Sequence, residues 1–200
     1  LYLILQYSLN DGFMADRNLM TPSTTSLNGM LGNGIVYRVP TFQRDYSWDV
    51  DNWTDLWDDI IIALEGKRDH YMGAIVVQTS GEKQFLVLDG QQRITTLSIL
   101  ALAVIQNLED LIHSNIEAED NRTRAEELRR SFLGQRDPAS LHYSSKLFLN
   151  ENNDAFYQSH LLQLRKVANE RSLSISDKLM WQAFQFFYKK VQQHFEGDLT

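Results

Sequence analysis

A change of hydrophobic period between residues 85 and 112 most constrains what this chain can fold into. The run FLVL ends at Asp89-Gly90, and beyond the following QQR the apolar residues recur at intervals of three and four as far as Ile112. A short apolar run closed by a turn signal is typical of a buried strand, and three-four spacing is typical of a buried helix. The pattern predicts a strand, a tight turn at the glycine and a long core helix directly after it.

The segments before this junction predict a small mixed sheet with helices, because runs rich in β-branched residues alternate with one amphipathic run and are separated by Gly and Pro. The predicted elements are a helix at Leu27–Leu31, a strand at Ile35–Val39, a helix capped by Asp49 or Asp51 and ended by Gly66, and strands at residues 71–80 and 84–88 joined by a GEK turn.

The segments after Ser114 predict helices alone. Mixed charges predict an exposed helix or lobe edge first, and two amphipathic helices follow with Asn150 and Ser176 as candidate caps. We therefore expect an α+β fold in which an all-helical subdomain follows the sheet. The predicted divisions are a poorly ordered extension at 1–26, a core at 27–113 and a helical subdomain at 114–200, and we expect the chain to be a piece of a longer protein.

Composition narrows the function classes. A hydrophobic content of 43% suffices for one sizeable core, or one core with a helical annex. The formal charge of -7 argues against a uniformly basic nucleic-acid surface but allows a local basic groove. The absence of cysteine excludes disulfides and thiolate zinc sites and fits the cytoplasm. Residues 1–13 are apolar for only about half a membrane span, so we expect no membrane segment.

The DGQQR junction is the first candidate site. The start of a helix presents unpaired backbone N–H groups, and a glycine there lets the backbone approach an anion closely. Arg93 can bind phosphate in a two-pronged contact, and Gln91 and Gln92 can donate amide hydrogens. Asp89 can cap the helix, hold a divalent ion or orient a water. Spacing alone leaves an ordinary Asp-Gly turn equally open. Thr95 and Thr96 add hydroxyl groups in the first turns.

The segment YRVPTFQRDYSW, from Tyr37 to Trp48, is the second candidate. Gln43, Arg44 and Tyr46 bring an amide, a guanidinium and an aromatic ring together just after a strand. Such a set can stack on a base and bind phosphate, although aromatics that pack under the next helix are the commoner case. Because this Gln-Arg pair resembles the one in DGQQR, we expect the two to share one site.

Other candidates are weaker. The five histidines lack metal-ligand spacing. Asp55, Asp58, Asp59 and Glu65 form the acidic side of one predicted helix, where a solvated face is the expected role; Asp58 or Asp59 as a magnesium ligand is the minor alternative. Phosphate-loop and dinucleotide fingerprints are missing.

Three stretches, VPTFQRDYSWDVDNWTDLWDDI, HYMGAIVVQ and FLVLDGQQRITTLSIL, resemble in order and separation the N-terminal domain family of GmrSD-type modification-dependent restriction enzymes. The resemblance is strong over residues 27–108 and weaker through LFLNENNDAFYQ and the last helix. It implies a core similar to the ParB/sulfiredoxin fold, in which DGQQR binds and hydrolyses a nucleoside triphosphate (NTP) to regulate DNA cleavage.

Carried onto this sequence, the resemblance implies a nucleotide site, an expected Mg²⁺ cofactor and DNA, in some cases modified, as a partner. The HNH nuclease that usually accompanies the family domain has no signature in these residues, so cleavage is assigned to another domain or chain. From the residues and the resemblance together, the predicted catalytic residues are Asp89, Gln92 and Arg93; the predicted phosphate-binding residues are Gln43, Arg44, Gly90, Gln91, Arg93, Thr95 and Thr96; and the predicted residues of the pocket or DNA-sensing surface are Tyr37, Tyr46 and Trp48.

The leading hypothesis from the sequence is thus a regulatory or sensor domain that binds and hydrolyses NTP in an anti-phage restriction system. Two alternatives remain at this stage. One is a DNA-binding module without catalysis that uses the same arginines on backbone phosphates. The other is a ParB-like metal-dependent nuclease that acts through Asp89, although metal-assisted hydrolysis usually needs several carboxylates.

Overall fold

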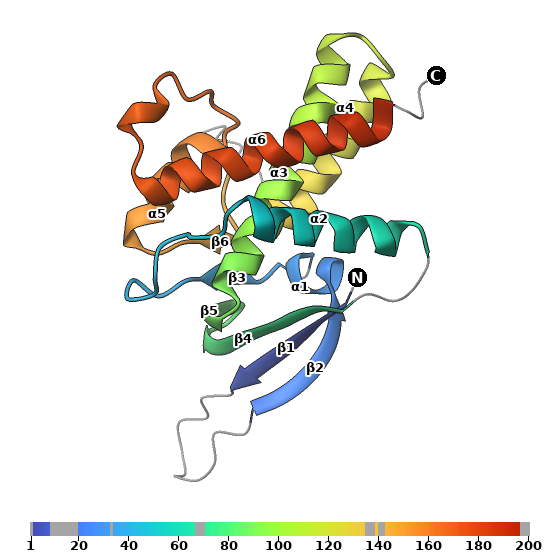
Figure 1. Ribbon diagram of the computed structural model, residues 1–200. Coiled ribbons are helices and arrows are strands. Elements are labelled where there is room, and N and C mark those ends of the chain that lie inside the picture. The colour runs from blue at the N-terminus through green and yellow to red at the C-terminus, as the bar shows by residue number, and fades with distance from the viewer. Residues whose placement is uncertain are drawn as a thin grey trace, which may run out of the picture.

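The computed structural model describes residues 2–8, 20–32, 34–66, 71–134, 139 and 143–196. A six-stranded mixed sheet lies at one end of the molecule and the helices are stacked above it (Figure 1). The strands are β1 (Tyr2–Ser8), β2 (Met20–Ser26), β3 (Val36–Arg38), β4 (Tyr71–Gly81), β5 (Gln84–Asp89) and β6 (Leu147–Phe148). The α-helices are α1 (Leu27–Leu31), α2 (Val50–Leu64), α3 (Gln91–His113), α4 (Ala118–Leu128), α5 (Glu151–Phe156) and α6 (Ile175–Glu196). This architecture confirms the predicted α+β class.

Strand order in the sheet is β2-β1-β4-β5-β3-β6. β4 and β5 form the predicted antiparallel hairpin, β1 pairs antiparallel with β2 and parallel with β4, and β3 pairs parallel with both β5 and β6. The sheet therefore includes two strands from within residues 1–26, a stretch whose sequence suggested a poorly ordered extension. It also includes β6, which lies in the part predicted to be all helical. A strand of two residues has no periodicity to detect, and only its pairing with β3 defines it.

Local capping signals place the ends of α2 as the sequence predicts. The Asp49 side chain accepts a hydrogen bond from the Asp51 N–H and, with Asn52, forms a capping box at the first turn. Trp53, Leu56, Trp57 and Ile60 form the buried face. The prediction for α6 was wrong by two residues, because the Ser174 hydroxyl accepts from the Asp177 N–H while Ser176 is buried and contacts Asn153.

One hydrophobic cluster joins the sheet to the helices. It includes Ile75 and Val87 from the β4–β5 hairpin, Leu102 from α3 and Phe187 from α6. α3 rises from the sheet between the other helices and packs against α4 and α6 (Figure 1). Length and composition alone would let α3 cross a membrane, but half of its most apolar 18-residue window is buried inside the protein, as in the core helix of a globular domain. The cytoplasmic location remains a prediction.

Candidate functional site

Gly90 begins α3 in the left-handed region, with φ +84°. A Cβ atom at this position would lie 3.0 Å from the Ala74 carbonyl oxygen and 2.9 Å from Ile75 Cγ1. The glycine is therefore required for the close approach of this turn to β4. Asp89, which is exposed at the end of β5, accepts a hydrogen bond on Oδ1 from the Gly90 N–H at 2.7 Å. Its carboxylate thus holds the turn, and Gly90 occupies the N-cap position.

The two glutamines of DGQQR hold the backbone of the neighbouring segment. Gln91 Nε2 donates to the Arg44 carbonyl at 2.8 Å. Gln92 Nε2 donates to the Asp45 carbonyl at 3.1 Å, and its Oε1 accepts from the Ser47 N–H at 2.8 Å. Both side chains are buried. The amide group of Gln92 is therefore engaged with protein at both polar atoms, and that of Gln91 is engaged at Nε2.

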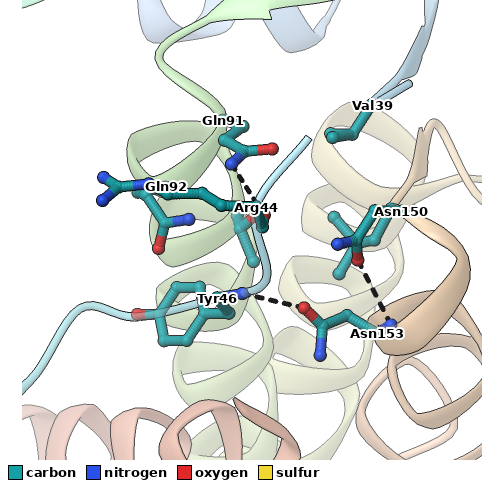
Figure 2. A pocket seen from close by; sticks show the side chains of 9 residues that line it. Val39, Arg44, Tyr46, Gln91, Gln92, Asn150 and Asn153 are labelled. Carbon is teal, nitrogen blue, oxygen red and sulfur yellow. Dashed lines mark hydrogen bonds between the residues drawn. The ribbon is translucent and has the colours of Figure 1, made fainter. Parts of the chain in front are cut away.

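Residues 42–48, named here the FQRDYSW segment, also accept hydrogen bonds from, and donate them to, side chains at the start of α5. Asn150 Nδ2 donates to the Gln43 carbonyl at 3.0 Å and to Asp45 Oδ1 at 2.7 Å, and Asn153 Oδ1 accepts from the Tyr46 N–H at 2.8 Å. Figure 2 shows the Tyr46 backbone directed at Asn153. The sequence indicated Asn150 only as a helix cap, a role it also fills. No local signal reveals its second partner, which lies 107 positions away.

Tyr46 is the centre of a buried hydroxyl chain. Its hydroxyl accepts from Trp53 Nε1 at 3.0 Å and contacts the Thr96 hydroxyl at 2.8 Å. Since Thr96 donates its own hydrogen to the Gln92 carbonyl, the Tyr46 hydroxyl is the donor to Thr96. Burial raises the pKa of the Tyr46 phenol well above its ordinary value, which keeps it protonated and able to donate.

A small pocket lies between the FQRDYSW segment, α3 and α5 (Figure 2). Its free volume of about 10 Å³ is about that of one water molecule. A nucleotide does not fit this space. The pocket is lined by Val39, Arg44, Tyr46, Gln91, Gln92, Thr95, Leu149, Asn150 and Asn153.

A second, larger hollow contains Arg93 and is called the Arg93 cleft. Its volume is about 190 Å³. Arg93 Nη1 donates to the Ala74 carbonyl at 2.9 Å, and the guanidinium crosses Gly73, where a Cβ would lie 2.6 Å from Cζ. Within the described ranges, no carboxylate forms an ion pair with Arg93. The cleft is lined by Trp48, Asn52, Asp55, Leu56, Asp59, Met72 and Arg93.

The predicted site residues therefore separate into three places. The two Gln-Arg segments are joined by hydrogen bonds, but Arg44 lines the small pocket and Arg93 lines the cleft, so the two arginines do not line one pocket as the sequence suggested. Trp48 also lines the cleft. Tyr37 lies with neither, because it is fully buried and its hydroxyl donates to the Met30 carbonyl at 2.9 Å. Asn52 from α2 and Met72 from β4 also line the cleft, and no pattern in the sequence indicated a role for either at the site.

Metal ligands do not cluster in the described ranges, where no group of three or more His, Asp or Glu side chains could hold an ion. His113 Nδ1 contacts the Glu109 carbonyl, and His160 and His194 pack against aromatic rings. His70 and His142 lie outside the described residues.

A family model described as "GmrSD restriction endonuclease, N-terminal domain" matches residues 27–198. The chain belongs to this family and is thus part of a restriction endonuclease system, a class of enzymes that acts on DNA. No curated protein matches the chain.

Proposed function

We propose that this domain binds and hydrolyses a nucleoside triphosphate in the Arg93 cleft, and that the nucleotide regulates the restriction system to which the domain belongs. The observation that carries the proposal is the half-buried Arg93 guanidinium. Of its five N–H donors, one has a described protein partner, and no carboxylate in the described ranges forms an ion pair with it. A half-buried guanidinium without an ion-pair partner favours an anionic ligand.

The surroundings of Arg93 suit a nucleotide. Trp48 is half-buried in the same cleft and offers an aromatic surface for a base. A volume of about 190 Å³ is below the roughly 300 Å³ at which typical ligand pockets begin. The cleft would therefore enclose the phosphates and leave the rest of the nucleotide at its open mouth.

The acidic residues of the cleft support a magnesium nucleotide over a bare one. Asp55 and Asp59 lie one turn apart on α2 and would repel phosphate by themselves. Magnesium in phosphate sites is typically bound through one or two carboxylates together with the substrate phosphates. These two carboxylates would hold the ion, which supplies charge neutralisation when bound.

Hydrolysis would proceed by attack of water on the terminal phosphate, with positioning and charge stabilisation as the main contribution of the protein. Arg93 is the residue of the predicted catalytic set that lies in the cleft. Gln92 is engaged by both of its polar atoms, and Asp89 holds its own turn, so the proposal gives neither of them a direct role.

The test is a screen of all four NTPs for binding and phosphate release, with unmodified and modified DNA, in wild type and three variants. Arg93→Ala should abolish turnover, and Arg93→Lys should keep the charge but lose the two-pronged contact. Arg122→Ala on α4, an exposed arginine paired with Glu119, is the matched control and should behave as wild type. If the folded Arg93→Ala variant still hydrolyses NTP, the Arg93 cleft is not the site of hydrolysis. DNA binding that falls with salt and ignores every NTP would instead favour the non-catalytic alternative.

A further inference from the structure

Phe42 is the most solvent-exposed aromatic ring among the described side chains, with 82% of its surface exposed. A phenylalanine left in water forgoes the favourable free energy of burying its ring. Single exposed apolar residues are common on protein surfaces, so exposure alone carries little weight. Phe42 differs from other exposed apolar residues because the loop that carries it is ordered by hydrogen bonds.

The loop around Phe42 is fixed on both sides. Before the ring, Pro40 has a restricted φ and its carbonyl accepts from the Gln43 N–H at 3.1 Å. After the ring, Gln43 Nε2 donates to the Leu88 carbonyl at 3.0 Å, and Asn150 Nδ2 donates to the Gln43 carbonyl. Gln91 then holds the Arg44 carbonyl. The backbone is therefore ordered before any partner arrives, which lowers the entropy cost of binding through Phe42.

A cation accompanies the ring. The Arg44 side chain is exposed, two positions after Phe42, and no described hydrogen bond or ion pair engages its guanidinium. The nearest acidic neighbour in sequence, Asp45, accepts hydrogen bonds from Asn150 and Asn152. An exposed aromatic ring two residues from an exposed guanidinium, in one ordered loop, suits a nucleobase and a nearby phosphate.

We propose that Phe42 stacks on an unpaired or extruded DNA base while Arg44 binds an adjacent backbone phosphate. DNA is favoured over a protein partner because the chain belongs to a restriction endonuclease family and because Arg44 complements phosphate. In this proposal Phe42 and Arg44 contact DNA, whereas the sequence suggested Tyr46, which is buried. The inference is independent of the nucleotide proposal, because it concerns the exposed Phe42 loop and DNA, not the Arg93 cleft and a nucleotide.

The test measures binding of the chain, without nucleotide, to three fluorescent DNA probes: a paired duplex, the same duplex with one base opposite an abasic site, and the single strand. Phe42→Ala should weaken binding to the two probes with an unpaired base by roughly 5- to 150-fold, the range for loss of one base stack. Phe42→Trp should retain binding and show quenched indole fluorescence on single strands. Arg44→Ala should reduce the salt slope on the single strand by about 0.7.

Ile175→Ala is the matched control, since this side chain is 85% exposed at the start of α6. It should bind all three probes as wild type does. If Phe42→Ala binds every probe with wild-type affinity, or if Ile175→Ala loses as much affinity, the stacking assignment is overturned. Because the probes are used without NTP, a negative result in this experiment does not bear on the Arg93 proposal.

Discussion

Gln92→Ala gives a direct test of whether the glutamines of DGQQR act on a ligand or hold the FQRDYSW segment. The substitution removes two hydrogen bonds, one to the Asp45 carbonyl and one from the Ser47 N–H. At about 1 kcal/mol for each bond and about 0.8 kcal/mol for a buried methylene, the loss is roughly 2–3 kcal/mol, slightly offset by the helix propensity of alanine. For a chain of this length, Tm should fall by about 5–10 °C.

Urea and thermal unfolding followed by circular dichroism would measure this change. Gln192→Ala is the matched control, because this glutamine is exposed on α6, and its effect should stay within about 0.5 kcal/mol. A Gln92→Ala protein with wild-type stability but no NTP turnover would refute the structural role and restore a catalytic one. Lower stability with retained turnover in the folded fraction would support the role described for this side chain.

Two further substitutions test the packing around the site. Tyr46→Phe leaves the buried Trp53 Nε1–H without an acceptor and should cost about 1–3 kcal/mol in urea unfolding; an effect below about 0.5 kcal/mol would contradict the hydroxyl chain. Gly90→Ala places a Cβ 3.0 Å from the Ala74 carbonyl oxygen at positive φ and should lower the free energy of unfolding by at least about 1–2 kcal/mol. The control Gly81→Ala meets no atom within 4 Å, so equal losses at the two positions would refute this explanation.

Local signals predicted the elements of the fold well. The three-four spacing after Gly90 and the Asp49 cap correspond to α3 and α2, and the GEK turn joins β4 to β5. These features depend on residues within a few positions of one another. β6 depends instead on pairing with β3, more than a hundred residues earlier, and its two residues carry no pattern of their own.

The site was harder to predict, because the chemical type of a side chain does not reveal its partner. Gln91 and Gln92 have donors suited to phosphate, yet both donate to backbone carbonyls 47 positions away. Tyr46 is aromatic and follows an arginine, as a base-stacking residue would, but it packs beneath α2 and hydrogen-bonds Trp53. The arginine of DGQQR lies in the larger cleft, where a phosphate ligand could reach it.

The hydrogen bonds from Asn150 and Asn153 to the FQRDYSW segment delay the ordering of this segment during synthesis. On the ribosome, residues 42–48 emerge about a hundred residues before the asparagines that fix their backbone. Such distant contacts slow folding, since a long loop must close before they form. The two halves of the candidate site should therefore become ordered together and late, and a nascent chain that ends before α5 should lack the fixed Phe42 loop.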